Sequence, residues 1–314
     1  MINYNPKEWG RFLITFNRAD TVRKLFPVLI GVGIYSFVIV HAIELLNLSE
    51  YPHLKNFSLM HTLLSFVISM LVVFRTNTAY DRWWEGRKLW GSLVNNSRNL
   101  ALKLDQLLEP VQTEDRQFFR NMIPNFAFAL KNHLRQQSFE PEFTATPSFS
   151  IENLRLNEHV PQQIALIIFG KINELQRRGI LLPEHLIILN SESQSLMDIC
   201  GACERIKNTP IPFSYSSFIK KFISMYCLTL PIGYVSSLHY LVIPLVVFVF
   251  YVLASLEIIA EEIENPFGTD ANDLPLDTIC KGIHKTVTQS FDHMLTLEEA
   301  DQHSEMPKGF SYEK

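Results

Sequence analysis

One apolar stretch, residues 57–74, contains large side chains at regular spacing. Within it Phe66, Met70 and Phe74 recur four residues apart, so a helix places them on one face. If several copies of this helix surround an axis, these side chains form successive apolar rings, and such rings can gate ion flow by dewetting. The alternative is ordinary contact with lipid or with neighbouring helices, because any apolar span offers such a stripe. The spacing alone leaves both interpretations open.

A charged stretch, RTNTAYDRWWEGRKLWG, follows this span directly as residues 75–91, and no Gly or Pro separates the two. We therefore expect one long helix that leaves the membrane and continues into water. The simplest interpretation of the charged half is a solvated helix with ion pairs between its own turns. Its tryptophans, Trp83, Trp84 and Trp90, argue against plain solvation, because exposed tryptophans usually mark an interface.

A second group of polar residues follows the last apolar segment, in the string EEIENPFGTDANDLPLD. Its NPFG sequence is a turn signal, and Asp270 and Asp273 come next with Asn272 between them. Oxygen ligands this close could hold a hard cation such as calcium. Simple capping of the turn, in which Asp and Asn bond nearby backbone N–H groups, is the favoured alternative.

The remaining candidates for chemistry are weak, and they argue against an enzyme. Cys200 and Cys203 form a C-x-x-C pair, which we interpret as two buried thiols one turn apart on a helix and not as a redox or zinc site. The ten histidines show no ligand spacing, and the sequence holds no phosphate-binding loop or nucleophile elbow. The net charge of −4 gives no case for a nucleic-acid partner.

The elements that would position these residues are four apolar segments, residues 25–46, 57–74, 218–238 and 241–260, each close to the length that spans a bilayer. Gly31 and Gly33 in the first segment would allow close helix packing. Arg75, Arg82 and other cations follow the second segment, so the positive-inside rule places this side in the cytoplasm. Four spans then put both termini of a multi-pass inner-membrane protein in the cytoplasm.

The rest of the pattern is that of soluble helices. Helices are expected at residues 121–135, 161–178 and 183–207, with a loop at 138–157. The predicted organisation of the chain is an N-terminal cytosolic segment, two spans, a cytosolic helical domain, two more spans, and an acidic turn with a cytosolic tail: residues 1–24, 25–75, 76–215, 216–260 and 261–314.

Three strings taken together, FRTNTAYDRWWEGRKLWG, ERIKNTPIPFSY and EEIENPFGTDANDLPLD, resemble the bestrophin family of ion channels, in its bacterial branch. Their order and spacing match, and the resemblance covers about residues 20–300. It implies an all-α membrane protein that assembles as a homopentamer around a central pore. Each subunit would have four transmembrane helices and a large cytosolic helical region.

The resemblance also assigns roles to residues of the pore. The hydrophobic neck of the family falls on Phe66, Met70 and Phe74, and the tyrosine behind the neck helix falls on Tyr215. The narrow cytosolic aperture falls on Glu184 by a gap-free count, where family members often have an apolar residue, and a shifted count would place it on Leu182 or His185. A ring of five carboxylates there would attract cations and repel anions, against the anion preference usual in the family.

The same resemblance places a calcium clasp at the acidic turn, as animal members of the family have it. Glu262 and Asn265 would supply carbonyl oxygens, and Asp270 and Asp273 carboxylates. The animal run of consecutive acids is thinned here to DAND. We therefore expect no cofactor, with calcium at this turn as the alternative that the resemblance leaves open.

The predicted function is a passive channel for small monovalent ions, chloride by resemblance, or cations such as sodium if the Glu184 ring filters. Its partners would be further copies of itself, the bilayer and the ions. A secondary transporter would need ionisable residues deep in the spans, whereas here the charges cluster at the ends. A membrane-anchored scaffold that binds a partner through its cytosolic helices is the third class.

Overall fold

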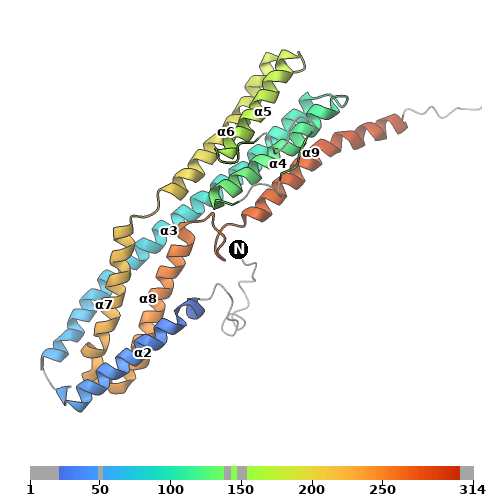
Figure 1. Cartoon of the computed structure of the whole chain (residues 1–314). Coiled ribbons are helices and arrows are strands. Elements are labelled where there is room, and N and C mark those ends of the chain that lie inside the picture. The colour runs from blue at the N-terminus through green and yellow to red at the C-terminus, as the bar shows by residue number, and fades with distance from the viewer. Residues whose placement is uncertain (1–20, 49–51, 138–142, 147–153, 305–314) are drawn as a thin grey trace, which may run out of the picture. The chain divides into compact units, whose positions relative to one another are not determined.

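Every regular element in the described part of the chain is a helix (Figure 1). The structure is a computed structural model that describes residues 21–48, 52–137, 143–146 and 154–304. Its helices are α2 (Thr21–Leu45), α3 (Pro52–Leu107), α4 (Thr113–Arg135), α5 (Val160–Arg177), α6 (Pro183–Asn208), α7 (Phe213–Leu238), the 3₁₀ turn η4 (His239–Leu241), α8 (Val242–Glu264) and α9 (Leu276–Ser304). The all-helical prediction is thereby confirmed for these residues.

The chain divides into two compact units, and α3 contributes to both. The first unit comprises Met1–Glu85 and Thr209–Leu274, and the second Gly86–Asn208 and Pro275–Lys314. No Gly or Pro occurs between Phe57 and Glu85, and α3 runs for 56 residues through this stretch and past Gly86 and Gly91. The expected single helix across the apolar and charged stretches is therefore present.

The first unit is built from helices that are apolar on nearly all sides. Helices α2, α7 and α8 pack against one another. The first part of α3 adds Ile68 and Val72 to their shared core, which also contains Ile223, Leu230 and Val246. Three stretches of the described residues are long and apolar enough to cross a membrane: 21–45, 57–107 and 213–264, of which the last contains both α7 and α8.

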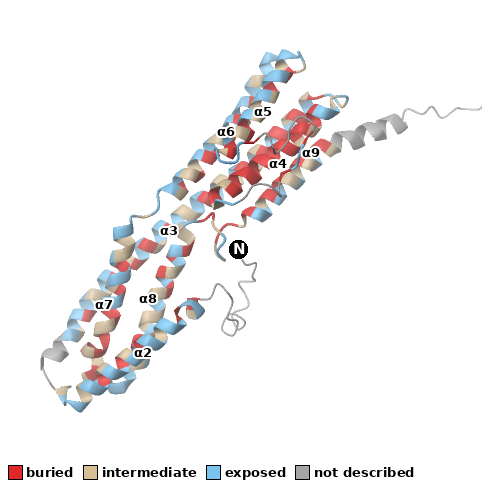
Figure 2. Ribbon diagram, in the orientation of Figure 1, coloured by how far each residue is buried: buried red, intermediate tan, exposed pale blue. Residues whose placement is uncertain are grey.

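Large apolar side chains remain exposed on the outside of this unit. On α2 they recur at helical spacing, with Phe26, Ile30, Ile34 and Phe37 each about half exposed or more. An apolar stripe of this kind is what a bilayer covers. Figure 2 shows exposed residues along α2, α7 and α8, in contrast to the mostly buried α4.

The glycines in the membrane helices pack differently from the prediction. Gly33 does face α8, with Val247 Cγ2 at 3.6 Å from the position of an added Cβ, but Gly31 faces open space. The tightest glycine contact in these helices is instead at Gly233 of α7, where an added Cβ would lie 3.0 Å from His61 Nδ1. The prediction for Gly31 was wrong because its position on α2 faces away from the helix bundle.

The second unit is a helix bundle with α4 at its centre. Most residues of α4 are buried, among them Phe119 and Phe126. Helices α5 and α9 pack against α4, and α6 packs against α5. The predicted helices at 121–135, 161–178 and 183–207 correspond to α4, α5 and α6. The predicted loop at 138–157 lies largely outside the described residues.

Candidate ion-conduction site

The predicted neck residues form part of an exposed apolar face on the first half of α3. The exposed fractions of Phe66, Met70 and Phe74 in the single chain are 68%, 44% and 55%. Leu59 and Leu63 extend the same face, each 67% exposed. At about 100° per residue, these positions lie on one side of the helix.

The opposite side of α3 packs against other helices of the same chain. Its buried residues are His61, Ile68, Val72, Arg75 and Ala79. Because the core of the chain covers that side, the exposed face that contains Phe66 is left for lipid or for further copies of the chain. Tyr215, in the first turn of α7, is half-buried and packs against the core cluster that contains Ile68 and Val72, which is the side of α3 behind the predicted neck.

The C-terminal end of this apolar span is held by a buried charge cluster. Arg75 is 1% exposed; its Nη2 donates to Glu264 Oε2 at 2.7 Å and its Nε to Glu257 Oε1 at 3.4 Å, both on α8. Arg75 therefore pairs with α8 and not within its own helix. The interpretation of this arginine as part of a solvated helix surface was wrong, because α8 supplies carboxylates that the local sequence does not contain.

Next along α3, Arg82 and Trp83 bind the backbone of two other segments. Arg82 Nε donates to Glu264 O at 3.0 Å, and its Nη1 donates to Thr209 O at 2.6 Å. Trp83 Nε1 donates to Asn272 O at 3.0 Å. The Ile211 N–H in turn donates to Glu264 Oε1 at 2.7 Å. The three sequence strings that carry the resemblance thus meet around the C-terminus of α8.

The tryptophans after the span have different surroundings. Trp84 is 48% exposed, whereas Trp90 is fully buried. The interface signal therefore remains at Trp84, and Trp90 belongs to the core of the second unit. Sequence spacing could not separate these cases, because both residues stand in the same charged string.

The acidic turn is held by contacts among its own residues and with α2. Asp273 is buried, and its Oδ2 accepts the Asp270 N–H at 2.7 Å. Glu262 accepts from Asn272 Nδ2 at 2.6 Å and forms an ion pair with Lys24 of α2. Asn265, the C-cap of α8, is exposed. These contacts fit turn capping, the interpretation favoured from the sequence, and they do not test the calcium alternative.

Glu184 lies in the first turn of α6 and its side chain is exposed. Its position at the start of a helix is the one that the resemblance requires of the aperture residue. It belongs to the second unit, whereas the neck residues belong to the first.

Comparison with known proteins defines the class to which this arrangement belongs. The family model of bacterial and fungal bestrophin proteins matches residues 1–289. A protein from Nostoc sp. named as voltage-dependent anion channel-forming is 40% identical over 237 residues, which are 74% of this chain and 76% of that protein. A protein of the same description from Escherichia coli O157:H7 is 36% identical over 235 residues, again 74% of this chain and 76% of the other.

Solved structures agree with these relatives. Two crystal structures of mutant forms of a bacterial bestrophin homologue from Klebsiella pneumoniae match with TM-scores of 0.76 and 0.77. Their sequence identities are 26% and 27%; they cover 85% of this chain and 98% and 99% of the homologue. The chain is thus a membrane protein of the ion-channel class. It belongs to the bestrophin family, as a member of the bacterial and fungal group.

Proposed function

We propose that the chain forms a passive homopentameric channel in the inner membrane that conducts small monovalent ions along its five-fold axis. The first half of α3 lines this axis, and Phe66, Met70 and Phe74 form the apolar neck. Tyr215 supports α3 from behind. Both termini lie on the cytoplasmic side, with the second unit in the cytosol.

The observation that carries the proposal is the two-sided character of α3. One side is buried in the subunit and fixed by the contacts of Arg75, whereas the other exposes bulky apolar side chains at regular spacing. A ring of such side chains narrows a pore without binding the ion, and it limits conduction through the cost of dehydration. Membership of the channel family supports placing this side at the axis.

Two observations bear on the sign of the conducted ion, and they point in opposite directions. The named relatives are described as anion channel-forming proteins. The exposed carboxylate of Glu184 would give a pentamer a ring of five negative charges, which favours cations. In this proposal, the side chain of Glu184 decides whether the channel prefers anions or cations.

The test is the reversal potential of the purified protein in planar bilayers with asymmetric sodium chloride, for the wild type and for Glu184→Gln. If the Glu184 ring filters, the substitution moves the reversal potential toward that of chloride. Glu109→Gln, at another exposed carboxylate, is the matched control and leaves it unchanged. An identical reversal potential for all three proteins contradicts the role of Glu184. Absence of current in several salts contradicts the channel itself and favours the scaffold.

A further inference from the structure

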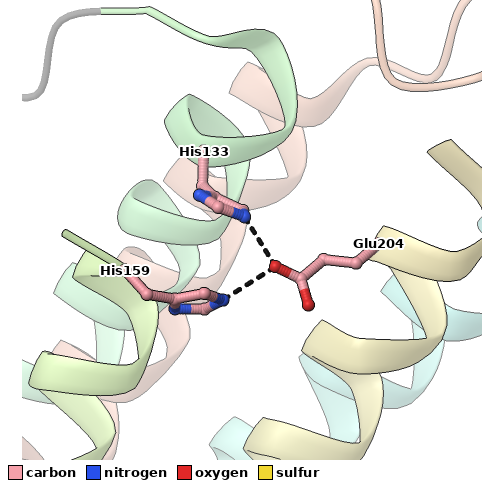
Figure 3. Close-up of side chains that lie close together, drawn as sticks. All are labelled: His133, His159 and Glu204. Atoms are coloured by element: carbon pink, nitrogen blue, oxygen red, sulfur yellow. Dashed lines mark hydrogen bonds and ion pairs between the residues drawn. The ribbon is translucent and has the colours of Figure 1, made fainter. Parts of the chain in front are cut away.

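Three segments that are far apart in the sequence bring metal-ligating side chains to one point in the second unit (Figure 3). His133 lies in the last turn of α4, His159 is the N-cap of α5, and Glu204 lies on α6. The Nε2 atoms of His133 and His159 are 2.6 Å and 2.7 Å from the same oxygen, Glu204 Oε1. The two imidazole rings approach to 4.5 Å between centroids.

The spacing of these atoms is close to that of a metal site. The three ligand atoms all lie within 4.8 Å of one another. Zinc bonds of about 2.0–2.2 Å in a tetrahedral site place neighbouring ligand atoms roughly 3.3 Å apart. The carboxylate therefore needs to withdraw from the imidazoles by less than about 1 Å. Rotation about the side-chain bonds of Glu204 supplies a movement of this size.

We propose that His133, His159 and Glu204 bind a divalent transition-metal ion of the zinc type. Two imidazoles and one carboxylate are a donor set that zinc takes in proteins, with a fourth position left for water. Hard cations such as magnesium and calcium prefer a shell made of oxygen atoms alone, which this site does not offer.

The surroundings give the ion both access and room for the water. A cavity of about 560 Å³ adjoins the three side chains, and Asn132, Gln136 and Lys207 are among the residues that line it. An entry path of this kind is required of a site that fills after folding. The ion would bind from the cavity side, with its fourth position directed to solvent.

Cys200 is the protein group that competes for the fourth position. It precedes Glu204 by one turn of α6, and its Sγ lies 4.0 Å from His159 Nε2. Cys200 does not line the cavity that adjoins the three proposed ligands. The fourth position is therefore assigned to water, which enters from the cavity.

His159 ties the site to the start of α5. Its Nδ1 accepts the Gln162 N–H at 3.1 Å, so a neutral ring carries its proton on Nε2 and donates it to Glu204. An ion that binds Nε2 displaces the proton there to solvent, and Nδ1 takes up a proton from solvent so that the ring stays neutral. The protonated Nδ1 no longer accepts the Gln162 N–H, so this cap of α5 is lost. Metal occupancy is thus coupled to the first turn of α5.

The experiment uses the full chain purified in detergent, stripped with a chelator and then titrated with zinc chloride. The stoichiometry after dialysis and the affinity from competition with a zinc-binding dye are measured. We expect one zinc per chain. Glu204→Gln keeps the shape of the side chain and removes its charge, and His159→Asn keeps an N-cap residue while removing the imidazole. Each is expected to weaken binding at least about tenfold.

His284→Asn, which removes a histidine of α9, is the control and binds zinc like the wild type. The proposal is overturned if the wild type retains no zinc, or if both site variants bind as tightly as the control. In the cobalt-substituted protein we expect the visible bands of a four-coordinate site, unchanged in Cys200→Ser. A thiolate-to-cobalt charge-transfer band that Cys200→Ser abolishes overturns the assignment of water to the fourth position.

Discussion

At the scale of single residues, Arg75 shows how a charge at the edge of an apolar span is accommodated. It stands directly after Phe74 and is buried to 1% exposure. Two carboxylates of α8, Glu257 and Glu264, receive its N–H groups. A charged group taken out of water is tolerated only with such partners. Arg75 therefore fixes the orientation of α3, and with it the direction in which the Phe66 side faces.

Replacement of Arg75 is expected to destabilise the protein strongly. Arg75→Met leaves the buried Glu257 carboxylate without its partner, and breaking a buried pair in this way costs about 3–5 kcal/mol. The midpoint of thermal unfolding in detergent measures the loss. Arg75→Met combined with Glu257→Gln should recover part of it. Lys88→Met, at an exposed position on the same helix, should change little, and an equally large loss there would contradict the account.

At the scale of helices, the apolar segments and the uninterrupted α3 could be predicted, because length, hydropathy and the absence of Gly and Pro are local properties. The buried Cys200 and Cys203 were also predicted correctly, from their spacing on one helix. The partners of Arg75 and Arg82 could not be found in this way. They lie more than 120 residues away in the sequence, and only the packing of α8 and of residues 209–211 brings them together.

The cluster of His133, His159 and Glu204 could not be predicted from the sequence for the same reason. Glu204 is separated from His133 by 71 positions and from His159 by 45. No spacing rule covers ligands from three helices. The one local signal was the Pro161 that follows His159, since proline in the first turn of a helix marks the preceding residues as its cap.

The contact between α3 and α7 is expected to depend on Gly233. An added Cβ would lie 3.0 Å from His61 Nδ1, and His61 is held by Phe57 O at 2.7 Å and Thr229 Oγ1 at 2.9 Å. Gly233→Ala should therefore destabilise the protein by about 1–3 kcal/mol through overpacking. Thermal unfolding in detergent measures this. Gly31→Ala is the control, because its added Cβ meets open space, and it should leave stability unchanged or raise it. A larger loss of stability in Gly31→Ala than in Gly233→Ala would refute the packing argument.

The packing of α9 against α4 should become less stable in acid. Burial alone would raise the pKa of Asp277, but hydrogen bonds from Arg135 and Lys131 outweigh it and hold the pKa at about 2. An unfolded chain has a pKa of about 3.9 for this group. The contribution of Asp277 to stability is therefore fully present above about pH 4 and is lost as the pH falls towards 2.

Acid unfolding between these pH values measures the contribution. Asp277→Asn should lower stability at neutral pH and flatten its acid dependence. Glu109→Gln replaces an exposed carboxylate of the same unit and should leave the curve as in the wild type. If the stability of Asp277→Asn depends on pH as steeply as that of the wild type, other groups cause the loss of stability in acid.

At the scale of the whole molecule, a pore lined by α3 requires several copies of the chain. A single subunit exposes large apolar side chains on α2, on α8 and on the Phe66 side of α3. Lipid covers apolar surface of this kind, but a pore requires that one such side face other copies. We predict that the protein in lipid nanodiscs has the mass of five chains. A monomer would contradict the proposed channel.

The conductance of single channels with an altered neck tests the central claim most directly. Phe66→Ala removes one ring of bulky side chains, so the dehydration barrier falls and the conductance should rise several-fold. Phe248→Ala makes the same change at an exposed position of α8 and should leave the conductance unaltered. If Phe66→Ala conducts like the wild type, or if both variants change alike, the side chain of Phe66 does not face the ion path.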